Sequence, residues 1–312
     1  MTARAGGGPD LLNLEGLADY DIRWPWTRKR LVPGMTTVLR VKNEARSLPW
    51  VLPPMFAATQ HVVLVDNASE DQTAEAAREI AARHDASDRL TVKEYPFRAS
   101  RCGPEHLATP ERSVHSLAYY YNWAFSHVET TYSLKWDGDM VLTAEGVAAI
   151  DALSWQLQSV EAVVSIPRHP VYVASDQIAY IDLGWRNVEF YGYPMGPAYP
   201  YVKAFEWELR LAPDDVRSVR LPEGLAIELK YLDADELSHW TSTDAFATSA
   251  RTARKRRELE VSSALAAGNW QHLEGVVRIE SPAGVHVIDH ITQHWLPEAE
   301  RPLVDDVRGR QR

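Results

Sequence analysis

The stretch that decides the fold spans residues 61–83 and runs HVVLVDNASEDQTAEAAREIAAR. Its first part, residues 61–65, is an almost continuous apolar run rich in valine, which is typical of a strand buried in a parallel sheet. A polar turn follows at residues 66–73. The alanine-rich run after the turn contains neither Gly nor Pro, and it predicts a helix that ends near residue 84. The stretch is therefore a strand, a turn and a helix in succession.

The same alternation continues on both sides of this stretch. The sequence predicts further strands at 36–41, 90–95, 131–136 and 162–167, and helices at 47–59, 115–128 and 143–159. We expect three prolines to interrupt the helix at 47–59. This order predicts an α/β fold with a mainly parallel sheet and flanking helices, whose ligand sites lie at the carboxyl ends of the strands. The alternation stops in an aromatic-rich segment at 172–207, and a last helix is predicted at 251–267 with a basic, solvated face.

Composition excludes several classes of function. The 312 residues are 45% hydrophobic and 24% charged, as in an ordinary globular protein, and the length suits one large domain or two smaller ones. The formal net charge of −10 argues against a nucleic-acid partner, because such binding needs a positive field. A single cysteine, Cys102, excludes a disulfide within the chain and fits a reducing compartment.

Membrane targeting is also not indicated. The first residues lack the apolar segment of a secretion signal, and no later stretch approaches 18 consecutive apolar residues. We therefore expect a cytoplasmic protein without an integral membrane segment.

The residues most suited to chemistry are Asp137-Gly138-Asp139, at the end of the strand predicted at 131–136. Two carboxylates separated by a glycine can lean toward one cation, and Mg²⁺ or Mn²⁺ prefers such oxygen ligands. The same triplet is also common as a simple turn. Asp66 ends another predicted strand, which brings a third carboxylate to the same edge of the sheet. The first strand ends in Arg40, Asn43 and Glu44, which suit contacts to a phosphate, a ribose or a base, or else a capped and solvated loop.

Three segments together resemble family-two glycosyltransferases: residues 38–44 (VLRVKNE), 63–73 (VLVDNASEDQT) and 134–139 (LKWDGD). In that family the first strand ends in a similar Asn-Glu, the second in an Asp-x-x-Ser-x-Asp-x-Thr pattern, and the fourth in an Asp-x-Asp motif that binds metal. The resemblance covers roughly residues 35 to 145.

The resemblance implies a GT-A fold, a nucleotide-sugar donor and Mn²⁺ or Mg²⁺ as cofactor. It places Asp66 near the base or ribose, Asn43 and Glu44 beside the nucleoside, and Asp139 on the metal with Asp137 nearby. The residue Asn122 is similar to an asparagine that the family carries in the helix before the acidic motif, although it also suits an ordinary helix position.

On the acceptor side, residues 205–210 (FEWELR) resemble the family's acidic segment, in which a carboxylate acts as general base. Here glutamates replace the aspartates, so Glu206 is the first choice of base and Glu208 the second. The same alternation also suits an exposed strand, and Asp182 and Asp244 are further candidates. An inverting transfer needs such a base and a retaining transfer does not.

GT-A enzymes often add a late histidine to the metal or diphosphate. The candidate ranked first is His239, which precedes an aromatic residue, and His290 is the second. Histidines 286, 290 and 294 are spaced for one helical face, but Pro282 and Val285 favour a strand or loop there.

Other classes of enzyme fit less well. A nucleotidyltransferase or a Rossmann dehydrogenase needs a glycine-rich phosphate loop after the first strand, and residues 40–43 contain no glycine. A catalytically silent protein that binds nucleotide sugars or carbohydrate stays open, because the donor side is better marked than the base. The aromatic segment suits a flat acceptor such as a sugar ring, a lipid headgroup or a small aglycone.

The expected organisation has three parts. It consists of an irregular lead-in at 1–34, a GT-A domain at 35–245 with a donor half at 35–145 and an acceptor half at 146–245, and a C-terminal helix and tail at 246–312.

Overall fold

The computed structural model describes residues 10–205, 207–233 and 250–294. Within these residues an eleven-stranded sheet is flanked by helices, and a two-stranded hairpin lies beside it. The parallel part of the sheet has the order β3-β2-β1-β4. Its strands are β1 (Val32–Val41), β2 (His61–Asp66), β3 (Leu90–Glu94) and β4 (Thr130–Asp137). The predicted α/β fold class is confirmed.

Strand register brings the predicted site residues to one edge. In the pairing of β1 with β2, Val41 lies opposite Asp66, and in the pairing of β1 with β4, Arg40 lies opposite Asp137. Because all four strands run in the same direction, their carboxyl ends open on the same side of the molecule.

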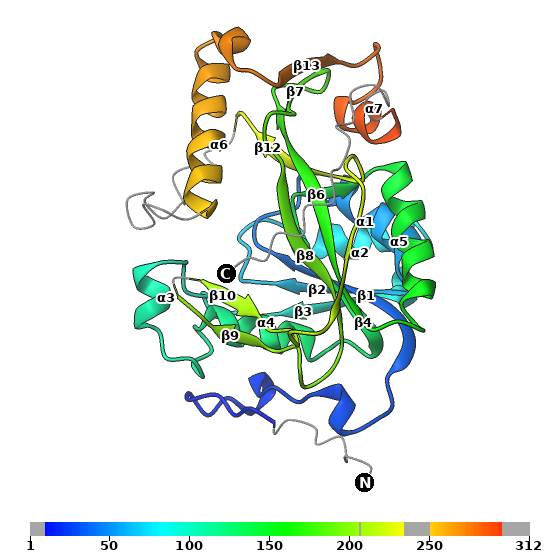
Figure 1. Cartoon of the computed structure of the whole chain (residues 1–312), viewed down its shortest axis with the longest axis vertical. Coiled ribbons are helices and arrows are strands. Elements are labelled where there is room, and N and C mark those ends of the chain that lie inside the picture. Colours follow the sequence, from blue (N-terminus) through cyan, green and yellow to red (C-terminus); the bar gives the residue numbers. More distant parts are fainter. Residues whose placement is uncertain (1–9, 206, 234–249, 295–312) are drawn as a thin grey trace.

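Helices cover both faces of the parallel strands (Figure 1). One face packs against α1 (Leu48–Ala58), α2 (Thr73–Arg83) and α5 (Ala144–Gln156). The other packs against α4 (Leu117–Phe125) and the N-terminal segment, which contributes Ile22 and Trp24. Alternate side chains of β2 divide between the two cores, so both faces of this strand are buried, as its apolar run predicts.

The helix α1 differs from expectation because it continues through Pro53 and Pro54 without a break. Proline removes a backbone donor inside a helix and normally costs about 3 kcal/mol. Here Val51, Leu52 and Met55 are fully buried against the sheet. Burial of one such side chain contributes about 1.5 to 3 kcal/mol, so the packing of the helix outweighs its local strain.

The aromatic-rich segment forms strands that extend the sheet on the far side of β4. The long strand β6 (Ala162–Val173) is antiparallel to β7 (Ile178–Asp182) and β8 (Asn187–Pro194), and parallel to β11 (Arg217–Arg220) and β12 (Ala226–Tyr231). The strand β8 joins this part to β4.

The remaining elements are short or peripheral. They are β5 (Met140–Leu142), the hairpin strands β9 (Tyr201–Lys203) and β10 (Glu208–Arg210), β13 (Val276–Glu280), the helices α3 (Pro104–Ala108), α6 (Ala250–Ala266) and α7 (Val287–Gln293), and 3-10 turns at Ala18–Tyr20, Pro25–Thr27, Ser87–Arg89 and Trp270–His272.

Two expectations about the C-terminal part were wrong. The basic face of α6 is not fully solvated, because Arg254 pairs with Glu189 at 3.3 Å and Arg257 with Asp182 at 2.8 Å. The acidic partners lie on distant strands, so local sequence could not reveal them. The histidine-rich segment forms the helix α7 instead of a strand or loop, and the His286 ring nitrogen accepts a hydrogen bond from the Ile288 N–H at its start.

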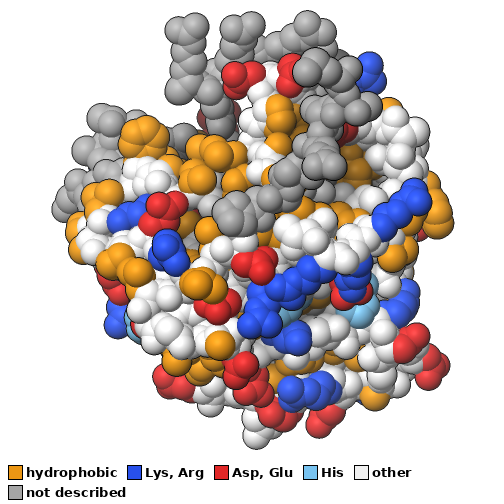
Figure 2. Space-filling model, turned by 90° about the horizontal axis from the view of Figure 1, so that it is seen from below, with side chains coloured by type: hydrophobic (Ala, Val, Ile, Leu, Met, Phe, Trp, Pro, Cys, Tyr) orange, Lys and Arg blue, Asp and Glu red, His pale blue; other side chains and the backbone are white. Residues whose placement is uncertain are grey.

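Acidic and basic side chains lie side by side on the face of the molecule seen in Figure 2. In the N-terminal segment, Arg28 pairs with Asp10 at 2.9 Å and Lys29 with Glu129 at 2.5 Å.

Among the described residues, no helix has the length and apolar character needed to cross a bilayer. The three-part division of the chain at residues 34 and 245 stays a prediction.

Candidate functional site

The Asp137-Gly138-Asp139 triplet forms the turn between β4 and β5. The turn is held from both sides, because the indole N–H of Trp136 donates to the Met140 carbonyl at 2.8 Å and the Leu229 N–H donates to the Asp139 carbonyl at 2.7 Å. Space at Gly138 is limited: a Cβ there would lie 2.5 Å from the Glu44 Cγ, so a larger residue would force that side chain to move. The Glu44 side chain therefore packs directly on this turn.

The first carboxylate of the turn belongs to an ion pair with β1. The Asp137 Oδ1 accepts from the Arg40 guanidinium at 2.5 Å. The Arg40 side chain is buried, and its guanidinium lies 3.8 Å from the centre of the Tyr121 ring. The Asp137 side chain keeps 36% of its surface exposed. Asp137 is thus fixed by one cation while still open to a ligand.

The second carboxylate faces β12. The Lys230 ammonium donates to the Asp139 Oδ2 at 2.8 Å and lies 2.8 Å from the Glu228 Oε1. The other Glu228 oxygen accepts from the Arg168 Nε at 2.6 Å. Burial raises the pKa of Asp139, and the nearby Lys230 ammonium opposes that rise. Asp139, 25% exposed, lies at the end of a chain of alternating charges that reaches into the sheet.

These pairs belong to a larger group that we call the ion cluster. It joins the turn to α6 and to strands on both sides of β4, and its members alternate in sign. Among the described residues it contains Arg40, Lys135, Arg168, Lys230 and Arg254, together with Asp137, Asp139, Glu189, Glu228 and Glu258. The formal charges of these ten residues cancel.

The chemistry of the turn fits a divalent cation. Asp137 and Asp139 offer partly exposed carboxylate oxygens, and Mg²⁺ or Mn²⁺ is often held by one or two carboxylates with water and ligand phosphates completing the shell. In the part of the chain that the structure describes, no group of three or more His, Cys, Asp or Glu side chains could hold a metal. Further ligands would have to come from outside this set.

The loops after β1 and β2 are bonded to each other at the same edge. The Asn43 side-chain carbonyl accepts from the Glu70 N–H at 2.7 Å, and the Asn43 N–H donates to the Ser69 hydroxyl at 2.9 Å. Asp66 accepts from the Ser69 N–H at 3.0 Å. Asn43 has a φ of 57°, in the left-handed region that asparagine tolerates better than most residues. Asp66 and Asn43 therefore shape a rigid double loop beside the turn.

One predicted donor residue, Asn122, bonds to the backbone of a neighbouring hairpin. Asn122 is buried on α4, and its amide bonds in both directions to the backbone of Tyr201, at 2.7 and 2.8 Å. This double bond to the backbone fixes the hairpin of β9 and β10 on α4. The donor contact expected for Asn122 stays a prediction, and a sequence pattern cannot distinguish the two roles because both need an amide at the same helical position.

The structure describes only some of the candidates for the general base on the acceptor side. Glu206 and Asp244 lie outside the described residues. Glu208 starts β10 and interacts electrostatically with His106 and Tyr121, the ring that stacks on Arg40. Its Oε2 is buried and has no hydrogen-bond partner among the described residues.

A third candidate has a different position. Asp182, on β7, is fully buried in an ion pair with Arg257. Of the described candidates, only Glu208 both interacts with Tyr121, the ring that stacks on Arg40, and has an oxygen without a hydrogen-bond partner among the described residues.

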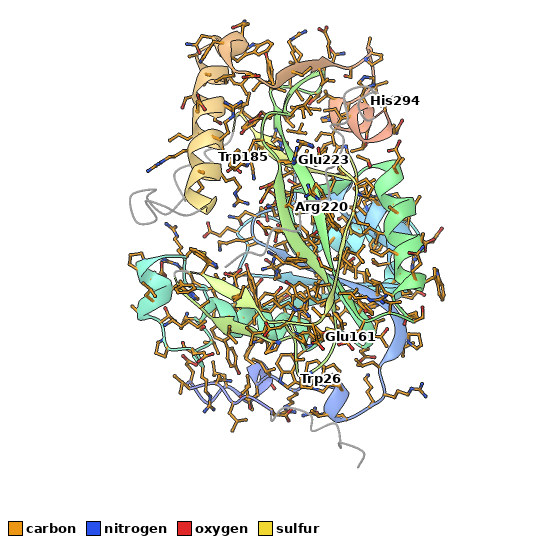
Figure 3. The ribbon with its side chains drawn as sticks, in the orientation of Figure 1. Trp26, Glu161, Trp185, Arg220, Glu223 and His294 are labelled. Atoms are coloured by element: carbon orange, nitrogen blue, oxygen red, sulfur yellow. The ribbon has the colours of Figure 1, made fainter. Side chains whose placement is uncertain are left out.

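The late histidines are similarly divided, since His239 lies outside the described residues. His286 packs on Trp50 with 4.5 Å between ring centres, and the His290 and His294 rings lie 5.3 Å apart. His294 is labelled at the end of α7 in Figure 3. Because no group of three potential ligands forms among the described residues, His290 does not join the two aspartates.

Sequence reasoning missed the cations that surround the turn. Arg168, Lys230 and Arg254 come from three separate elements, and each pairs with at least one carboxylate that lies 21 to 91 positions away along the chain. One local signal was available: Glu228 and Lys230 are two residues apart in an apolar strand, which puts both charges on one face. Two opposite charges inside a buried strand indicate an ion pair.

No family model and no curated protein matches the sequence. Solved structures do show likeness. A mannosyltransferase from Pyrobaculum calidifontis, in complex with GDP-Man and Mn²⁺, is 17% identical with a TM-score of 0.43, and the match covers 80% of this chain and 75% of that one. Residues 1–349 of S. aureus TarS are 17% identical with a TM-score of 0.30, covering 44% of this chain and 36% of that one.

A third similar structure is glucosyl-3-phosphoglycerate synthase from Mycobacterium tuberculosis, in complex with Mn²⁺, UDP and phosphoglyceric acid. It is 11% identical with a TM-score of 0.26, and the match covers 47% of this chain and 45% of that one. The chain thus spans less than half the length of the S. aureus and mycobacterial proteins. At these scores the likeness carries no conclusion about the chemistry of this chain.

Proposed function

We propose that this protein is a glycosyltransferase that moves a sugar from a nucleotide diphosphate sugar to an acceptor hydroxyl. The observation that carries the proposal is the turn Asp137-Gly138-Asp139. Its two partly exposed carboxylates lie at the carboxyl ends of parallel strands and are bordered by the basic side chains of the ion cluster. A site for a nucleoside diphosphate needs two kinds of side chain: carboxylates that bind the divalent cation, and basic groups that bind the phosphates.

The donor is assigned to the same edge. The diphosphate would lie near Asp139 and Lys230, and the nucleoside would lie across the ends of β1 and β2, within reach of Asn43, Glu44 and Asp66. Asp137 and Asp139 would hold Mn²⁺ or Mg²⁺, which neutralises charge on a departing diphosphate. The rigid double loop of Asn43 and Asp66 supports this assignment, because a preorganised loop loses little entropy when the nucleoside binds.

The acceptor would bind beside the hairpin of β9 and β10. Phe205 is 75% exposed and its ring centre lies 6.4 Å from that of Trp207, so the two rings offer an apolar surface to a sugar, a lipid headgroup or a small aglycone. In the proposed inverting transfer, Glu208 or Glu206 takes the proton of the acceptor hydroxyl. The acceptor oxygen then bonds to the anomeric carbon, while the bond from that carbon to the diphosphate oxygen breaks.

A thermal-shift screen of nucleoside diphosphates, with and without Mn²⁺, tests the donor side. A ligand present at 100 times its dissociation constant stabilises the folded state by about 2.7 kcal/mol, which corresponds to a rise of roughly 5 °C in Tm for a chain of this size. We expect such a rise for one nucleobase and only with the metal. No shift with any of them would refute the proposal.

Turnover distinguishes the enzyme from its alternative. A nucleotide-dependent shift without transfer to any member of an acceptor panel would favour a silent binding protein. When product does form, proton NMR of the new linkage separates inversion from retention.

A further inference from the structure

Both carboxylates of the turn are paired with cations of the chain, Asp137 with Arg40 and Asp139 with Lys230. The Lys230 ammonium is bonded to the Asp139 Oδ2 at 2.8 Å, and this is the residue to which the proposed function assigns a divalent cation. The Lys230 side chain is 14% exposed and that of Asp139 is 25% exposed. The pair is therefore partly shielded from water, where ionic interactions are stronger than at an open surface.

The ammonium has a second partner that holds it near the turn. Glu228 lies 2.8 Å from Lys230, but it also accepts from Arg168 at 2.6 Å. A divalent cation that displaces Lys230 from the Asp139 Oδ2 would remove one partner of the ammonium and leave it beside a like charge. Glu228, shared with the Arg168 guanidinium, compensates only in part. Binding of the metal alone is therefore opposed by the chain's own charge.

A nucleoside diphosphate removes this opposition. Its phosphate oxygens are acceptors for an ammonium group, and lysine is a common phosphate ligand. Since the formal charges of the ion cluster cancel, a metal cation or an anionic nucleotide that binds alone unbalances it more than the two bound together do. The two ligands should therefore bind better together than separately.

We propose that Lys230 competes with the divalent cation for Asp139. In the protein without ligands the Lys230 ammonium is bonded to Asp139, and when metal and nucleotide bind, it moves to the phosphate oxygens of the donor. This inference rests on the proposed function and adds a binding order to it. Lys230 makes metal affinity depend on the nucleotide, and by thermodynamic reciprocity it makes nucleotide affinity depend on the metal to the same degree. In this role Lys230 is both a positioning residue for Asp139 and a ligand of the donor.

The test is the affinity for Mn²⁺, measured from the electron paramagnetic resonance signal of free Mn²⁺ with no nucleotide, with UDP and with GDP. In the wild type we expect weak binding of Mn²⁺ alone and at least about tenfold tighter binding with one of the nucleotides, within the usual range of coupling between sites. In Lys230→Met, Mn²⁺ alone should bind at least about tenfold more tightly, and the nucleotide should add less. Lys230→Gln serves the same purpose if the methionine variant does not fold.

A control separates this effect from a general change of charge. Lys93→Met removes the same charge from β3, at the outer edge of the parallel strands, and should leave both affinities for Mn²⁺ unchanged. Binding of Mn²⁺ alone that is unchanged or weaker in the Lys230 variants would overturn the inference while leaving the proposed function intact. A wild type that binds none of the nucleoside diphosphates of the thermal-shift screen, with or without Mn²⁺, would overturn the proposed function itself.

Discussion

Replacement of Gly138 by alanine tests whether the turn is built as tightly as the structure indicates. A Cβ at this position would lie 2.5 Å from the Glu44 Cγ and 3.0 Å from both the Glu44 Cδ and the Val41 Cγ1. Contacts this short force neighbours to move, and such overpacking costs about 1 to 3 kcal/mol. The loss of glycine also stiffens the unfolded chain, which returns about 0.4 to 1 kcal/mol. We expect the free energy of unfolding to fall by roughly 1 to 2 kcal/mol.

Denaturant unfolding of Gly138→Ala and of Gly196→Ala measures this difference. Gly196 is a matched control, because nothing lies within 4 Å of a Cβ added there. The same proteins are titrated with nucleoside diphosphate and Mn²⁺, where Gly138→Ala should lose about tenfold or more in affinity because the carboxylates of the turn are displaced. Equal stability and equal affinity in the two variants would refute the tight packing of Glu44 on the turn.

A second substitution locates the clash. Adding Glu44→Ala to Gly138→Ala removes the nearest atoms and should recover most of the lost stability, since contacting residues couple by about 0.5 to 3 kcal/mol. Affinity for the nucleotide should not recover, because Glu44 is a proposed donor contact. Additive effects on stability would show that Glu44 is not the obstacle.

Three further predictions concern single side chains. Glu208→Gln should slow transfer by roughly 100-fold with donor affinity unchanged, and a large loss in Glu206→Gln alone would assign the base to that residue instead. Asp66→Asn keeps an acceptor for the Ser69 N–H but loses the charge, and calorimetry should show nucleoside diphosphate affinity weaker by about 1 to 3 kcal/mol; an unchanged affinity would make the role of Asp66 structural. Burial lowers the pKa of His127 from an ordinary 6.5 to about 4. Between these two pH values the unfolded chain binds a proton that the folded chain does not, so the free energy of unfolding should fall as the pH falls, by about 3 kcal/mol at most. His127→Gln should flatten that slope in denaturant titrations, and identical slopes would contradict the assigned pKa.

The parallel half of the fold could be predicted from sequence because its signals are local. The apolar run at 61–65 and the alanine-rich run after it each specify their own secondary structure. The bounds of β2 and α2 therefore lie within a residue or two of the predicted ones. The turn at Asp137-Gly138-Asp139 was found for the same reason. What local sequence misjudged was α1, where burial of one face outweighs two internal prolines.

The electrostatics of the site could not be predicted in the same way. Lys230 pairs with Asp139 across 91 positions of the chain, and Arg254 pairs with Glu189 across 65. Such contacts depend on strand order, which a single sequence does not specify. The same limit explains Asn122, whose amide suits a donor contact in sequence but binds the Tyr201 backbone in the structure. The sequence predicted which residues lie at the carboxyl edge of the sheet, but it did not predict which residue each of them pairs with.

The central claim is that Asp139 serves a metal-dependent transfer from a nucleotide sugar. The most direct measurement is release of nucleoside diphosphate from a panel of nucleotide sugars, with Mn²⁺ or with EDTA, by the wild type and by Asp139→Ala. Asp139 lies in a partly exposed turn and not in the apolar core, so the variant should keep its fold by circular dichroism. We predict release from one donor in Mn²⁺, none in EDTA and none by the variant. Release by Asp139→Ala at the wild-type rate would contradict the account.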